Sequence, residues 1–114
     1  MKNENNKVLK MVSELMGFCY RISSHKFNMD VDNFENKTIL TLVAYVNNLD
    51  TTTLDKAKDL LTSPRLHELE EYYWNLPGDD LYTSELNLVG MMCDKADIKY
   101  EDNKFLTITL IRYR

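Results

Sequence analysis

The sequence has few of the residues that mark specialised classes of protein. Its 114 residues include two cysteines, two prolines and three glycines. Two cysteines cannot build the disulfide framework of a small secreted scaffold, and isolated glycines exclude a glycine-rich phosphate loop. The longest apolar stretch, residues 38–46, is far shorter than a membrane span. We expect no signal peptide, no membrane contact and a cytoplasmic protein.

Clustered positive charge is also missing. Fourteen Lys and Arg residues are set against eighteen Asp and Glu residues, which gives a net charge of −4. Direct binding of nucleic acid needs several cations on one surface, so this class of function is excluded. Hydrophobic residues make up 44% of the chain, which is typical of a globular protein. Length and composition together predict a single domain over residues 1–114.

Hydrophobic periodicity predicts an α+β fold. A helical stripe covers residues 7–23, and alternating or β-branched strands follow at 26–33 and 38–46. Thr52 or Thr53 is expected to cap a helix, Ser63-Pro64 to start a second helix, and Thr83 or Ser84 to cap a third. Two further strands are expected, one beginning at Ile98 and one over residues 105–113. The order α-β-β-α-α-α-β-β predicts a four-stranded, mainly antiparallel sheet made of two hairpins, with helices packed on one face.

The most informative feature is that the two longest strands are apolar on both faces. Their aliphatic faces, which include Leu40 and Leu110, are expected to meet the helices. A sheet with one solvated face normally alternates apolar and polar residues, and these strands do not. Surplus apolar surface often marks an interaction site. The predicted interface residues of these strands are Ile39, Val43, Tyr45, Ile111 and Tyr113.

Two alternatives explain the same pattern without a partner. Exposed pairs of Tyr, Thr and Ile stabilise a sheet by themselves, and a helix of the same chain could cover the second face. Tyr72 and Trp74 extend the predicted interface, because the run Tyr72-Tyr73-Trp74 cannot bury all of its rings on one side of a helix.

Residues with catalytic potential occur in weak patterns. His67 and Glu71 lie one helical turn apart but lack the second histidine of a metalloprotease motif. Asp79-Asp80 follows a Pro-Gly turn, where acidic residues commonly keep a loop solvated. Cys19 and Cys93 fall at apolar helical positions, so both are expected to be buried free thiols. We therefore expect no enzyme activity, no cofactor and no metal.

Three functional hypotheses remain. The first is a small non-enzymatic protein–protein interaction module of the inhibitor, immunity or regulatory adaptor type, which acts through the open sheet face. Its partner would be another protein or a second copy in a homodimer. The second is a small-molecule sensor with a pocket lined by Met11, Met16, Met92 and Phe18. The third is a minor enzyme that uses the His and Glu of segment 67–71.

Overall fold

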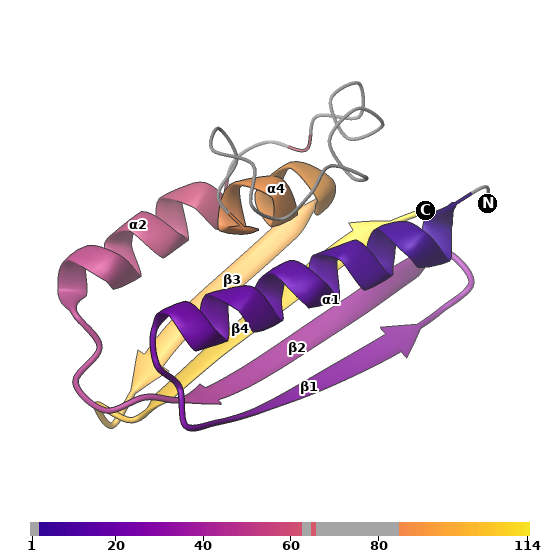
Figure 1. Ribbon diagram of the computed structural model, residues 1–114. Helices are drawn as coiled ribbons and strands as arrows, with labels where there is room; N and C mark the ends of the chain where they lie inside the picture. The colour runs from indigo at the N-terminus through magenta and orange to yellow at the C-terminus, as the bar shows by residue number, and fades with distance from the viewer. Residues whose placement is uncertain (1–2, 63–64, 66–84) are drawn as a thin grey trace.

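The computed structural model describes residues 3–62, 65 and 85–114 as a layer of helices on an antiparallel sheet (Figure 1). The predicted α+β fold is confirmed, and the predicted helix after Ser63-Pro64 lies outside the described residues. The elements, in chain order, are α1 (Glu4–Arg21), β1 (Lys26–Asn33), β2 (Lys37–Tyr45), α2 (Thr51–Leu61), α4 (Glu85–Met92), β3 (Lys95–Glu101) and β4 (Phe105–Tyr113).

The sheet consists of two hairpins joined through their apolar strands. The strand order is β1-β2-β4-β3, and every neighbouring pair is antiparallel. The strands that are apolar on both faces, β2 and β4, are therefore the two central ones, and the charged strands β1 and β3 form the edges. The turn Glu101–Lys104 closes the second hairpin with Asp102 and Asn103 both at positive φ, as a type I′ turn requires.

The core lies between the sheet and the helices. Leu40, Leu42 and Ala44 of β2 are fully buried, as are Leu106, Ile108 and Leu110 of β4. Met11, Leu15 and Cys19 of α1 and Val89 of α4 cover them. This confirms that the aliphatic faces of both strands meet the helices. None of the described helices is long and apolar enough to cross a membrane.

The burial of residues in α1 differs from the predicted helical stripe in two ways. Met16, which helical spacing from Val8 and Val12 places on the apolar stripe, is 39% exposed, and Lys7 and Glu14, which are charged, are buried. Lys10 forms an ion pair with Glu14 at 2.9 Å. Long charged side chains can bury their stems while their charged groups are paired, so hydrophobicity alone misplaces them.

The start of α2 also differs from the prediction. The N-cap is Asp50, whose carboxylate accepts a hydrogen bond from the Thr52 backbone N–H at 3.4 Å. The sequence favoured Thr52 or Thr53 because Thr is a good capping residue. Asp at the preceding turn competes for the same role and ranks above Thr.

Candidate functional site

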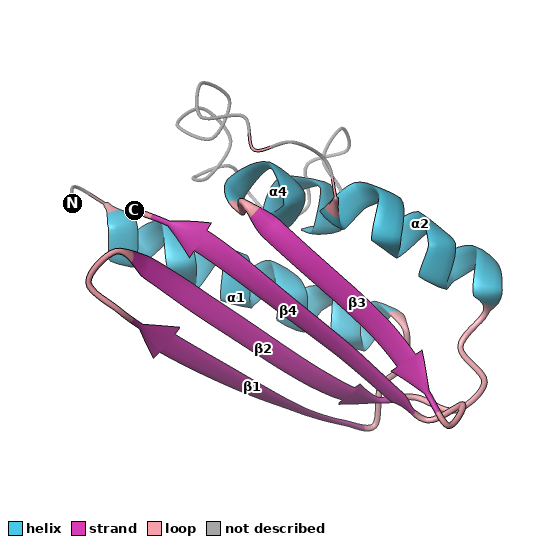
Figure 2. Cartoon of the chain, turned by 180° about the vertical axis from the view of Figure 1, so that it is seen from behind, coloured by secondary structure: helices cyan, strands magenta, loops and turns pink. Residues whose placement is uncertain are grey.

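The outward side of the sheet is the first candidate site. Figure 2 looks onto this side, with the four strands in front and the described helices behind them. We call it the open face and define it by the outward positions of each strand. These positions are Lys26, Asn28, Asp30 and Asp32 of β1; Lys37, Ile39, Thr41, Val43 and Tyr45 of β2; Phe105, Thr107, Thr109, Ile111 and Tyr113 of β4; and Lys95, Asp97, Lys99 and Glu101 of β3.

The structure brings the five predicted strand residues together on the open face. Ile39, Val43, Tyr45 and Ile111 are half-buried, and Tyr113 is 38% exposed. Ile39 pairs directly with Ile111 across the central strands. Because residues of one face alternate along each strand, all five lie on the same side of the sheet. Tyr72 and Trp74, the other predicted interface residues, lie outside the described residues.

One end of the open face is aromatic. The rings of Tyr45 and Phe105 meet edge to face with centroids 5.2 Å apart, which is a favourable geometry for aromatic pairs. The Lys26 Nζ lies 5.3 Å from the centre of the Tyr45 ring. Phe105 was absent from the predicted interface residues, although its alternation with Thr107 and Thr109 places it on this face.

Charged side chains flank the apolar centre on both edges. Lys26, Asp30 and Asp32 belong to β1, and β3 alternates strictly in sign through Lys95, Asp97, Lys99 and Glu101. The prediction missed the charges of β3 because it began that strand at Ile98. The alternation of Ala96, Ile98 and Tyr100 with these charges was the available signal.

Polar contacts at the surface hold the C-terminal end of β4 in place. Asp94 accepts hydrogen bonds at 2.7 Å from both the Tyr113 backbone N–H and the Arg65 guanidinium. The same guanidinium donates to the Tyr113 carbonyl at 2.8 Å. These contacts fix the backbone of Tyr113, so its ring keeps a defined place on the open face.

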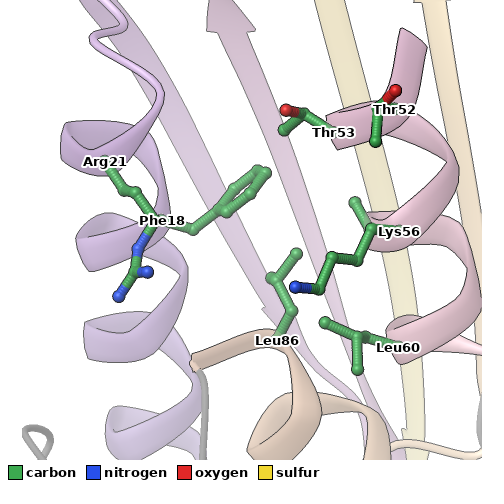
Figure 3. A pocket seen from close by; sticks show the side chains of 8 residues that line it. Phe18, Arg21, Thr52, Thr53, Lys56, Leu60 and Leu86 are labelled. Atoms are coloured by element: carbon green, nitrogen blue, oxygen red, sulfur yellow. The ribbon is translucent and has the colours of Figure 1, made fainter. Parts of the chain in front are cut away.

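A cleft between the helices is the second candidate site. It has a volume of about 360 Å³ and is bounded by residues of α1, α2 and α4. Phe18 extends from α1 toward α2, and Lys56 extends from α2 toward α1 (Figure 3). Of the predicted pocket residues only Phe18 lines this cleft, because Met11 and Met92 are fully buried in the core and Met16 is exposed.

The two thiols are unsuited to nucleophilic chemistry. Cys19 and Cys93 are free and buried, as predicted. Burial raises the pKa of each thiol to about 11. A thiolate is the reactive form of cysteine, and at neutral pH neither group supplies an appreciable amount of it.

The remaining chemical candidates lie elsewhere in the chain. His67, Glu71 and Asp79-Asp80 are outside the described residues. Within the described part of the chain, no three His, Cys, Asp or Glu side chains converge as a metal site would need. Comparison of the chain with models of protein families, with characterised proteins and with solved structures gave no match.

Proposed function

We propose that this protein is a small non-enzymatic interaction module that binds a protein partner through the open face. The observation that supports this is the apolar stripe across β2 and β4. Ile39, Val43, Ile111 and their aromatic neighbours remain partly exposed, and no described element packs over them. The Ile39–Ile111 and Tyr45–Phe105 pairs mark its two ends on the hydrogen-bonded central strands, and Val43 and the Thr41–Thr109 pair lie between them.

The arrangement has the anatomy of a protein interface. Typical interfaces combine an apolar, aromatic-rich centre with a polar rim. Here the rim is supplied by the charged edge strands, and Tyr45, Phe105 and Tyr113 supply large rings of the kind enriched at binding hot spots. Burial of the half-exposed aliphatic residues would provide the driving force for association.

The charge on the open face supports a protein partner over nucleic acid. Its four basic residues are Lys26, Lys37, Lys95 and Lys99, and its four acidic residues are Asp30, Asp32, Asp97 and Glu101. A balanced surface has no excess positive charge for phosphates. The two buried free thiols fit a reducing compartment, and we place the protein in the cytoplasm.

A second exposed apolar surface, on α1, provides the comparison for a test of the open face. Leu9 and Tyr20 of α1 are 64% and 70% exposed. They lie on the helix layer, across the sheet from the open face, and Met16, which is 39% exposed, lies one turn before Tyr20 in the same helix. We favour the open face because its apolar residues pair across two adjacent strands, whereas those of α1 form a single row along one helix.

The test compares Val43→Asp/Ile111→Asp with Leu9→Asp. Mass is measured by light scattering for the purified chain and by size-exclusion chromatography in extract of the cells that produce it. The wild-type chain is expected to exceed 13.4 kDa in at least one of these settings, because buried apolar area drives association. The double variant should then return to the mass of the single chain, and Leu9→Asp should not.

Two results would overturn the proposal. One is a wild-type chain of 13.4 kDa in both settings, and the other is an assembly that Leu9→Asp disrupts and the double variant does not. If the double variant does not fold, Thr41→Lys/Thr109→Lys takes its place. These positions are also central on the open face, and Lys can extend its charge into solvent in the free chain.

The cleft supports a second candidate function, binding of a small amphiphilic anion. Its volume falls in the range of about 300–1,000 Å³ that is usual for ligand pockets. The wall combines apolar Phe18, Leu60 and Leu86 with the cation of Lys56. Medium-chain carboxylates should raise the melting temperature, and Lys56→Glu should abolish that rise. No rise with any chain length would contradict this function.

A further inference from the structure

The charges on the two edge strands have a symmetric order. Along β3 the open-face residues Lys95, Asp97, Lys99 and Glu101 alternate positive and negative. If a second copy of β3 is laid over the first in the opposite direction, each charge lies over one of the opposite sign. Along β1 the first open-face residue is Lys26 and the last is Asp32, so reversal again places opposite charges together.

We propose that the partner of the open face is a second copy of this chain, bound face to face about a two-fold axis. The inference rests on the proposed function and names its partner. The axis lies between the two sheets and perpendicular to the strands, over the row of paired residues Met29, Leu42, Ile108 and Ile98. Each strand then lies over its own copy, running in the opposite direction, and the same surface is used by both chains.

This axis matches charges on both edges. On β3, Lys95 faces Glu101 of the second copy, and Asp97 faces Lys99 of the second copy. On β1, Lys26 faces Asp32 of the second copy. The one remaining edge contact pairs the neutral Asn28 with Asp30. No like charges meet on either edge strand, so the edges favour this orientation of two identical faces.

The same axis matches the apolar centre. Ile39 lies over Tyr45 of the second copy, and Ile111 lies over Phe105 of the second copy. Between them Thr41 meets Val43, and Thr107 meets Thr109. The bulky residues at the two ends of each stripe therefore cover one another, which is the arrangement that packs a two-sheet sandwich with a spacing of about 10 Å.

The other in-plane axis, parallel to the strands, is less favourable. It places β1 over β3 of the second copy and brings Asp30 directly over Asp97. That contact opposes two carboxylates at the rim and occurs twice in a symmetric dimer. Charge repulsion therefore distinguishes the two orientations, and they pair different residues at the ends of the edge strands.

The area of the open face is sufficient for a specific but modest dimer. Four strands at a spacing of roughly 4.8 Å, with central strands of nine residues, give a face of roughly 19 by 30 Å. Two such faces together bury about 1,100 Å², near the lower end of the range for specific interfaces. We expect dissociation in the micromolar range, where charge reversals have measurable effects.

The experiment uses two charge reversals on β3, Lys95→Glu and Glu101→Lys, alone and mixed. Dimer dissociation constants are measured by sedimentation equilibrium at about 20 mM salt, where surface charges are weakly screened. Each variant alone should dimerise at least about tenfold more weakly than the wild type. The equimolar mixture should regain wild-type affinity to within about threefold, because both edge contacts of the mixed dimer then join opposite charges.

Matched controls reverse the same charges on the helix layer. Lys58→Glu and Asp55→Lys alter the net charge as much as the β3 variants do, at exposed positions of α2, and should leave the dissociation constant unchanged.

The mixture of Lys26→Glu with Glu101→Lys would recover affinity only for the axis parallel to the strands. Recovery in that mixture, with none in the β3 mixture, overturns the proposed orientation.

A purified wild-type chain that stays monomeric at millimolar concentration overturns the second copy as partner. That result is distinct from failure of the proposed function. If the open-face substitutions Val43→Asp/Ile111→Asp still remove a heavier complex from cell extract, the module binds a different protein through the same face. Dimerisation that both β3 variants leave unaffected would place the contact on another surface and overturn the proposal.

Discussion

At the scale of single residues, the contact between Glu4 and Arg112 joins two buried side chains of opposite charge. The Arg112 Nε and Nη2 donate to the two carboxylate oxygens of Glu4 at 2.8 and 3.1 Å. Nη1 donates to the Met92 carbonyl at 2.6 Å. Arg112 is 2% exposed. The pair therefore ties the first turn of α1 to the last residues of β4 and to the end of α4.

Removal of the Glu4 carboxylate should destabilise the fold considerably. Glu4→Ala removes the carboxylate that accepts from Nε and Nη2 of the buried Arg112 guanidinium, which we expect to cost about 3 kcal/mol of unfolding free energy. Urea unfolding at fixed protein concentration measures the loss. Glu35→Ala, at an exposed position of the β1–β2 turn, should change stability by less than about 0.5 kcal/mol. Equal effects of the two substitutions would show that the buried pair contributes nothing.

The apolar replacement of both partners completes this test. Glu4→Leu combined with Arg112→Met should recover most of the lost stability, because the buried guanidinium and the carboxylate that it binds are then removed together. A double variant as unstable as Glu4→Ala would mean that the loss comes from packing rather than from charge.

This contact also shows what the sequence could not predict at the residue scale. The two residues are separated by 108 positions, and both lie at the end of an element, where a charged residue is normally exposed. A signal was present, since Arg112 follows Leu106, Ile108 and Leu110 in the alternation of the buried face. Periodicity could assign Arg112 to the core side, but it could not identify the distant carboxylate that neutralises it.

At the scale of elements, the fold was predictable wherever a local period determines a face. Strand alternation placed Ile39, Val43 and Ile111 on one side because successive strand residues point to opposite faces. The inward faces of β2 and β4 are aliphatic because these two central strands lie beneath the helices. The charged rim of β3 was missed because its first residues, Lys95 to Asp97, are mostly polar. An edge strand needs little apolar character, so composition understates its length.

The contact between α2 and α4 depends on a glycine. A Cβ atom on Gly90 would lie 2.1 Å from the Leu60 carbonyl oxygen, which belongs to the backbone of α2. The two helices can approach this closely only because Gly90 has no side chain. Gly17 in α1 differs, since a Cβ atom there would meet nothing within 4 Å.

Alanine at these two glycines should therefore have opposite effects. Gly90→Ala forces α4 away from α2 and should lower the unfolding free energy by about 2–3 kcal/mol. Gly17→Ala adds a better helix former at an exposed position and should raise it by about 0.5–1 kcal/mol. Urea denaturation monitored by circular dichroism measures both. A neutral Gly90→Ala would contradict the close approach of the two helices.

At the scale of the whole molecule, two layers leave one face of a four-stranded sheet without a cover among the described elements. The helices bury one side of β2 and β4, and the other side carries comparable apolar residues. A third layer can come only from another molecule or from residues outside the described ranges. If a second copy forms that layer, folding and association are thermodynamically linked, because the dimer contact exists only in the native state.

This linkage predicts that the melting temperature depends on protein concentration. For a native dimer that unfolds to single chains, a hundredfold increase in concentration adds about 1.4 kcal/mol of stability per chain. For a chain of this length, that corresponds to a rise of roughly 5 °C.

Differential scanning calorimetry over this hundredfold range of protein concentration should show the rise for the wild type and for Lys58→Glu. Val43→Asp/Ile111→Asp should melt at one temperature throughout, because its face cannot bury two carboxylates against a second copy. A wild-type melting temperature that is independent of concentration would mean that no second copy covers the open face when the native chain unfolds.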